Sequence, residues 1–178
     1  MRKIIVVCGI IAGIIVSVFM VSSIAVCYSS NNFEGNMLLG YAAMLLSFSL
    51  IFVGVRNFRD KYNGGFVSFG KAFQIGLYIS LIASTIYVIV WLVDYYLFVP
   101  EFMERYATHV MRELQQEGAS AQELQAESVK MDGYREMYKN PLMVILFTYF
   151  EILPVGLIVS LICALILKRK PTQSLPTA

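Results

Sequence analysis

The chain has 178 residues, of which 58% are hydrophobic and only 15% are charged, and its mean hydropathy is +0.67. This composition lies outside the range of soluble domains and indicates a polytopic membrane protein. The net charge of +2 is too small to suggest binding of nucleic acid, so no nucleic-acid partner is expected. The partner that composition does predict is the lipid bilayer.

Four nearly uncharged runs are long enough to cross a bilayer, since about 20 apolar residues span the hydrocarbon core as a helix. They cover residues 4–27, 37–55, 72–99 and 142–167. The third run is the clearest, because residues 72–93 contain no charged side chain. We therefore predict an all-α fold, a single membrane domain over residues 1–178 with four transmembrane helices.

The first run follows Arg2 and Lys3 but is too long for a cleavable signal peptide, so it is predicted to remain as the first helix. Gly9 and Gly13 form a GxxxG step that lets a second helix approach closely. Further candidate packing positions lie in the fourth run, at Gly156 and Ser160. Helix faces with such small residues pack either against another helix of the same bundle or against a second chain, in a homo-oligomer or a complex with another membrane protein.

The three cysteines lie in or at the ends of the predicted spans, at Cys8, Cys27 and Cys163. They have neither CxxC spacing nor a neighbouring histidine, so no metal and no cofactor are expected. We interpret them as small thiols that fill the core. A bridge between the Cys27 residues of two protomers is the alternative.

Basic residues gather at the edges of the runs rather than along one face. The loop over residues 56–71 carries four basic residues and one acid, and the segment after the fourth run carries three more. Short loops rich in Lys and Arg stay in the cytoplasm. The residues that set this topology are Arg56, Arg59, Lys61, Lys71, Lys168, Arg169 and Lys170. Both termini are therefore expected in the cytoplasm, with residues 28–36 and 100–140 outside.

Residues 65–71 match the spacing of a phosphate-binding P-loop, but the context contradicts that assignment. Ala72 stands where Ser or Thr would reach magnesium, and no strand precedes the loop. We interpret the segment as a glycine turn, with Phe66 and Phe69 at the level of the lipid head groups. Ser68 is then a suitable cap for the third helix.

Residues 100–140 form a polar excursion between the third and fourth runs. Pro100 is well placed to begin a helix, and Gly118 is a natural stop. Ser120 and Glu123 have the spacing of a capping box, which indicates a second helix. The segment is therefore predicted to be an extracytoplasmic helical hairpin that ends at Asn140 and Pro141.

Apolar residues recur along both hairpin helices, and the narrow stripe on the second suits packing against one partner helix. They are Phe102, Tyr106, Val110 and Leu114 on the first helix, and Leu124, Met131 and Tyr138 on the second. Eight acids and five bases make this segment mildly acidic. His109 is the only histidine in the chain and lacks a catalytic signature, so we expect it to face solvent. No enzymatic activity is expected.

Two acids lie inside apolar runs, where a charge costs about 2.5–3.5 kcal/mol at mid-membrane. Asp94 is about one turn from the outer end of its run, whereas Glu151 lies ~13 Å deep by helix rise. Pro154 follows Glu151 and is expected to kink the helix beside it. We therefore interpret Glu151 as a protonated side chain that bonds to a Ser, Thr or Tyr of another helix and holds the helices in register. The alternative is a proton or cation site.

Four segments of the chain carry a resemblance: residues 63–73, the hairpin exit at 136–141, residues 151–156 and the basic segment at 167–170. They resemble a bacterial membrane family catalogued only as a domain of unknown function. The resemblance covers nearly the whole chain and implies a multi-pass protein with four helices in the inner membrane of Gram-negative bacteria. It implies no activity and no catalytic residues.

Two hypotheses for the function follow. The first is a non-enzymatic structural or interaction protein that recognises a partner through the hairpin or through small-residue helix faces. The alternative is a small proton- or ion-coupled transporter or channel that uses Glu151, with Asp94 as a second candidate residue. A dry, tightly packed bundle would favour the first hypothesis, and a polar path that reaches Glu151 would favour the second.

Overall fold

The structure is a computed structural model that describes residues 1–30 and 37–170. Its elements in chain order are α1 (Arg2–Ser30), α2 (Met37–Asn57), η1 (Phe58–Tyr62), α3 (Phe69–Val93), η2 (Asp94–Phe98), α4 (Phe102–Gln116), α5 (Ala121–Tyr138) and α6 (Pro141–Leu167). Four of the helical segments are long and apolar enough to cross a membrane, and the described residues contain no β-strand. The prediction of an all-α bundle with four spans is confirmed.

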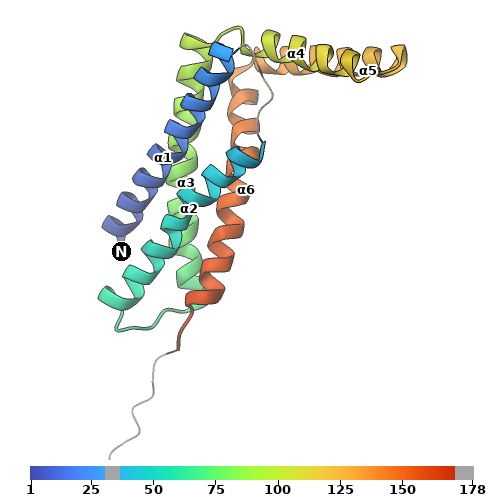
Figure 1. The fold of residues 1–178 in the computed structure, drawn as a ribbon. Helices are drawn as coiled ribbons and strands as arrows, with labels where there is room; N and C mark the ends of the chain where they lie inside the picture. The colour runs from blue at the N-terminus through green and yellow to red at the C-terminus, as the bar shows by residue number, and fades with distance from the viewer. Residues whose placement is uncertain (31–36, 171–178) are drawn as a thin grey trace, which may run out of the picture.

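Helix α3 runs through the middle of the bundle and contacts α1, α2 and α6 (Figure 1). The core is built from branched and aromatic side chains, and its largest fully buried members include Phe48, Ile51, Ile75, Ile79 and Ile152. The outer surface of the bundle is also apolar, with exposed residues such as Val18, Leu46, Phe150, Ile158 and Ile166. Apolar residues on both the inner and outer faces are what a bundle surrounded by lipid requires.

The loop before α3 begins with a glycine turn. Gly64 and Gly65 have positive φ angles of 63° and 84°, which glycine adopts without steric cost. Ser68 then caps α3 by accepting a hydrogen bond from the backbone N–H of Lys71 at 3.3 Å. Its cap role was expected from the sequence, and the structure confirms it.

Short π-helical turns extend α2 and α3. They are η1 and η2, and the wide turn of η2 is closed by the backbone N–H of Val99, which donates to the carbonyl of Asp94 at 2.9 Å. Turns of this kind are rare and are often found at functional sites. Here η2 carries the end of α3 toward the hairpin.

Helices α4 and α5 form the predicted hairpin, which projects sideways from one end of the bundle (Figure 1). Gly118 has a φ of +79° at the turn between them. Ser120 and Glu123 form the expected capping box at the start of α5. Met103 and Ala107 of α4 and Met131 of α5 are buried. The apolar positions Phe102 and Tyr106, by contrast, line cavities between the hairpin and the bundle.

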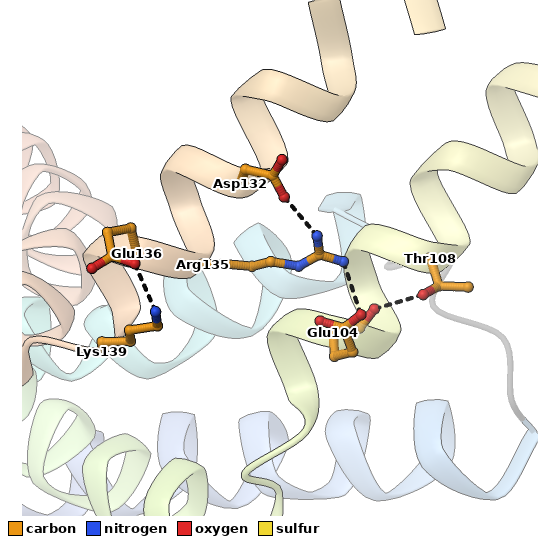
Figure 2. Close-up of polar contacts among 6 residues, drawn as sticks. All are labelled: Glu104, Thr108, Asp132, Arg135, Glu136 and Lys139. Atoms are coloured by element: carbon orange, nitrogen blue, oxygen red, sulfur yellow. Dashed lines mark hydrogen bonds and ion pairs between the residues drawn. The ribbon is translucent and has the colours of Figure 1, made fainter. Parts of the chain in front are cut away.

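Arg135 links the two hairpin helices, as Figure 2 shows. Its guanidinium donates to Glu104 on α4 at 3.0 Å and to Asp132 on α5 at 2.7 Å. Lys139 donates to Glu136 at 2.7 Å, but Glu136 lies in the last turn of α5 and Lys139 directly follows that helix, and both are exposed. Among these contacts, only the pair between Arg135 and Glu104 joins α4 to α5.

His109 does not face solvent as the sequence suggested. Its side chain is only 14% exposed, and its Nε2 lies 3.6 Å from Glu113 Oε2 one helical turn later. The imidazole therefore lies near a side chain of its own helix rather than extending into solvent.

Aromatic side chains join the hairpin to the bundle. Trp91 meets Phe102 edge to face at 5.3 Å, and Tyr95 meets Tyr138 at 5.5 Å. The guanidinium of Arg105 lies 4.7 Å from the centre of the Tyr28 ring. Edge-to-face and cation–π contacts each add to the apolar burial at such a junction. The hairpin is thus attached firmly enough to form one wall of a site.

Candidate functional site

Glu151 lies on α6, on the hairpin side of Pro154, and its side chain is exposed rather than packed. Helix α6 continues through Pro154 as far as Leu167. Tyr87 of α3 donates a hydrogen bond to Glu151 Oε1 at 3.4 Å, which is long compared with the usual 2.7–2.8 Å for an O–H···O bond. No other hydrogen bond to this carboxyl group is formed by the described residues. Most of its hydrogen-bonding capacity therefore remains unused.

A cavity of about 310 Å³ opens beside this carboxyl group. Its walls come from α1, α2, α3, α4 and α6, so residues distant in the sequence form a single space. The lining residues are Val16, Phe19, Met20, Ser23, Ile24, Cys27, Leu39, Gly40, Ala43, Met44, Tyr87, Phe102, Tyr106 and Glu151.

A second cavity of about 360 Å³ lies between the hairpin and α6. It is lined by Phe102, Met103, Tyr106, Tyr134, Tyr138, Phe147 and Glu151. Phe102, Tyr106 and Glu151 line both cavities, so the two cavities are neighbours that share these side chains. We name the two together the hairpin vestibule.

The hairpin vestibule is rich in aromatic rings. Phe102 and Tyr106 stack at 6.2 Å, as do Tyr138 and Phe147. Burial, followed by the nearby carboxylate of Glu151, raises the pKa of Tyr138 to about 12, so its hydroxyl is neutral at physiological pH. The vestibule thus places one acid among neutral aromatic side chains.

Farther from the hairpin than Tyr87 and Glu151, helices α3 and α6 are in close contact. The hydroxyls of Ser80 and Ser160 lie 3.1 Å apart. A Cβ atom added at Gly76 would lie 2.8 Å from Ser160 Cβ, and one at Gly156 would lie 2.8 Å from Ser80 Cβ. Glycine allows this close approach of the two helices. The candidate packing residues Gly156 and Ser160 therefore lie at this crossing.

The other two candidate packing residues, Gly9 and Gly13, lie against α3 of the same chain. A Cβ atom at Gly9 would lie 2.8 Å from Ile82 Cβ, and one at Gly13 would lie 2.8 Å from Ile86 Cβ. This face of α1 is thus occupied within the bundle. It is not available to a second protomer.

Asp94 is not brought together with Glu151, because it lines neither cavity of the hairpin vestibule. It is the first residue of η2 and is partly buried. Its Oδ2 atom is buried and has no hydrogen-bond partner among the described residues. The two acids that the sequence singled out therefore occupy separate environments.

The predicted topology-setting residues lie in the last turn of α2, in η1, at the start of α3 and after α6, at the end of the bundle opposite the hairpin (Figure 1). Asp60 bonds to Arg59 at 2.6 Å and lies 3.6 Å from Arg56. Lys71 donates to Gln74 at 3.1 Å. The basic segments therefore lie at the same end of the bundle, as expected for segments on one side of a membrane.

The aromatic wall of the hairpin vestibule was not anticipated from the sequence. Tyr87 and Tyr106 lie in separate helices, and neither has a local pattern that distinguishes it from an ordinary packing residue. Their role depends on α3, α4 and α6 meeting beneath the hairpin. Within residues 1–30 and 37–170, no group of three or more His, Cys, Asp or Glu side chains could hold a metal ion.

Comparison with known proteins gives a family but no closer relative. No curated protein and no solved structure matches the chain. One family does match, under the description "Protein of unknown function (DUF4199)", and the match covers residues 8–169. The chain belongs to this family.

Proposed function

We propose that this membrane protein binds a lipophilic cation in the hairpin vestibule, with the Glu151 carboxylate as the counter-charge. The observation that carries the proposal is that this side chain lines two cavities, of about 310 and 360 Å³. Known ligand sites have a similar character, being mostly apolar cavities with a few converging polar groups.

The lining of the hairpin vestibule supports a cationic ligand. The rings of Tyr87, Phe102, Tyr106, Tyr138 and Phe147 all contact the cavities. Aromatic faces attract ammonium groups, and aromatic cages are a common means of binding quaternary amines. The apolar residues of α1 and α2 along the first cavity suit an alkyl chain. An amine with such a chain matches both parts of the site.

The energetics of Glu151 also favour a ligand over a purely structural role. A carboxyl group within a membrane span is costly, and one weak bond from Tyr87 compensates for little of that cost. A cation in the hairpin vestibule would offset the remainder. The cavities therefore favour the alternative that uses Glu151 over a purely structural protein.

Binding is better supported than conduction. Ser80 and Ser160 are fully buried where α3 and α6 pack together, and Ile152 of α6 is also fully buried. A channel would need a continuous polar path through this packing. We therefore propose a non-enzymatic binding protein of the bacterial inner membrane whose hairpin vestibule is open on the extracytoplasmic side.

Trp91 provides a direct assay, because it is the only tryptophan in the chain and contacts Phe102 on the vestibule wall. Dodecyltrimethylammonium titrated into the full chain in a non-ionic detergent should change Trp91 emission saturably. Dodecanol has the same alkyl chain without the charge and should not. Glu151→Gln keeps the side-chain shape and should weaken binding about tenfold, which corresponds to ~1.4 kcal/mol.

The matched control is Glu136→Gln, which removes an exposed carboxylate of the hairpin outside the vestibule. It should bind the cation as the unchanged protein does. Equal affinity of Glu151→Gln and the unchanged protein, or an equal response to dodecanol, would contradict the proposal. Thermal unfolding without ligand would show that the variants are folded.

A further inference from the structure

A third cavity, of about 770 Å³, lies at the end of the bundle opposite the hairpin. It is bordered by the loop before α3 and by the segment after α6. The lining residues are Phe58, Asn63, Phe66, Val67, Ser68, Phe69, Lys71, Lys168, Arg169 and Lys170. Four of these side chains are cationic and none is anionic.

The backbone holds the two basic segments together. The N–H of Val67 donates to the carbonyl of Arg169 at 3.1 Å, and the N–H of Arg169 donates to the carbonyl of Val67 at 2.8 Å. Val67 is fully buried. Asn63 supports the loop by donating to the carbonyl of Phe66 at 2.7 Å. The cationic side chains are therefore attached to an ordered frame.

Little negative charge balances these cations. Asp60, the acid of this loop, is engaged by Arg59 and Arg56, which do not line the cavity. Lys168, Arg169 and Lys170 form no ion pair with any residue of the described ranges. Like charges held close together repel one another, and a bound anion relieves that repulsion.

The same cavity has an apolar border at the edge of the bundle. Phe66 and Phe69 are exposed there, and Phe58 is buried behind them. Helix α3 begins at Phe69, so the positive end of its dipole also points toward this end of the protein. Cationic groups next to exposed phenyl rings match a ligand with an anionic head and an apolar body.

We infer that this cavity binds the phosphate head group of an anionic phospholipid. Lys168, Arg169, Lys170 and Lys71 contact the head group, and Phe66 and Phe69 contact the upper acyl chains. A lipid is favoured over a soluble phosphate because the cavity lies at the end of a bundle whose outer surface is apolar. Basic pockets at the membrane surface attract anionic lipids in this way.

The inference can be tested by native mass spectrometry of the full chain in a non-ionic detergent. Phosphatidylglycerol, phosphatidylethanolamine and inorganic phosphate would be added separately at equal concentrations. Phosphatidylglycerol should remain bound and raise the unfolding temperature, whereas the other two should do neither. Equal retention of phosphatidylethanolamine, or equal stabilisation by inorganic phosphate, would overturn the assignment to an anionic lipid.

Variants test whether the cavity itself is responsible. Changing Lys168, Arg169 and Lys170 together to Gln should weaken phosphatidylglycerol binding by about tenfold or more, since each basic residue contributes to the attraction. The matched control changes Lys3 and Lys61 to Gln, because they are basic but do not line the cavity. Lys168→Arg with Lys170→Arg keeps the charge and should retain binding. Unchanged binding by the triple variant would overturn the proposal.

Discussion

The hydroxyls of Ser80 and Ser160 lie 3.1 Å apart where α3 crosses α6, and each serine faces a glycine of the other helix. Ser80 also bonds to the carbonyl of Gly76 at 3.0 Å, and Ser160 to that of Gly156 at 2.7 Å. A hydroxyl has only one hydrogen to donate, so these three contacts share two hydrogens. The glycines allow the approach, and the serines satisfy their polar groups within it.

Gly156→Ala should destabilise the bundle, because the new methyl group would lie 2.8 Å from Ser80 Cβ. Overpacking of this kind costs about 1–3 kcal/mol. Thermal unfolding in detergent measures the effect. Gly70→Ala is the matched control, since no atom lies within 4 Å of the added Cβ, and it should be neutral or slightly stabilising. Equal stability of the two variants would show that α3 and α6 are less closely packed than described.

Arg135→Leu should loosen the hairpin, because it removes the pair that joins α5 to Glu104 of α4. The effect should be small, about 0–1 kcal/mol, and should decrease at high salt because these groups are partly exposed. The rate of proteolysis within the hairpin measures it. Lys139→Leu removes a pair that does not reach α4 and should leave the rate unchanged. Faster proteolysis of that variant would mean that loss of any surface charge loosens the hairpin, and that the contact between Arg135 and Glu104 has no special role.

The stability of the first turn of α5 should depend on pH, because Glu123 titrates. The backbone N–H and the hydroxyl of Ser120 both donate to Glu123 at 2.8 Å and lower the pKa of its carboxyl group. Because the pKa of Glu123 is lower in the folded state, its ionised carboxylate stabilises the fold at pH values above the unfolded-state pKa of about 4.3. This stabilisation is lost as the pH falls through the folded-state pKa.

Amide chemical shifts of Ser120 and Glu123, recorded by NMR in detergent, should therefore show fraying of the first turn of α5 below about pH 4. Glu123→Gln keeps an acceptor for the same donors but cannot titrate. The Gln variant should remove the pH dependence. If the first turn of α5 frays in that variant with the same pH midpoint, the titrating group is not Glu123.

Cys27 should report occupancy of the hairpin vestibule, because it lines the first cavity while Cys8 and Cys163 are buried. With Cys8 and Cys163 changed to Ala, a maleimide should react at Cys27 alone. Saturating dodecyltrimethylammonium should slow that reaction several-fold by excluding the reagent, and Glu151→Gln should raise the concentration needed for half-maximal protection about tenfold. Equal protection by dodecanol would show that any alkyl chain covers the Cys27 thiol and that the positive charge is not needed.

The orientation can be tested by placing single cysteines at opposite ends of the bundle in a background without native cysteines. A membrane-impermeant thiol reagent should label Ser120→Cys, at the tip of the hairpin, in intact spheroplasts. It should label Tyr62→Cys only after lysis, although Tyr62 is 65% exposed. The reverse pattern would place the hairpin in the cytoplasm.

The sequence alone determined the number of spans and the positions of the hairpin helices. Both follow from local physics. An apolar run of membrane length must form a helix to satisfy its backbone, and Ser68 and Ser120 cap helices through partners only three residues away. The depth of Glu151 in its span could be inferred in the same way.

Only the tertiary structure decided what surrounds these residues. Tyr87 and Glu151 are 64 positions apart, and Ser80 and Ser160 are 80 apart, so no local pattern relates them. His109 was wrongly expected to face solvent, because no local pattern shows how far neighbouring side chains cover the imidazole. The hairpin vestibule exists because a hairpin of suitable length is attached to the bundle through Trp91 and Phe102, and contacts of that range arise from packing rather than from periodicity.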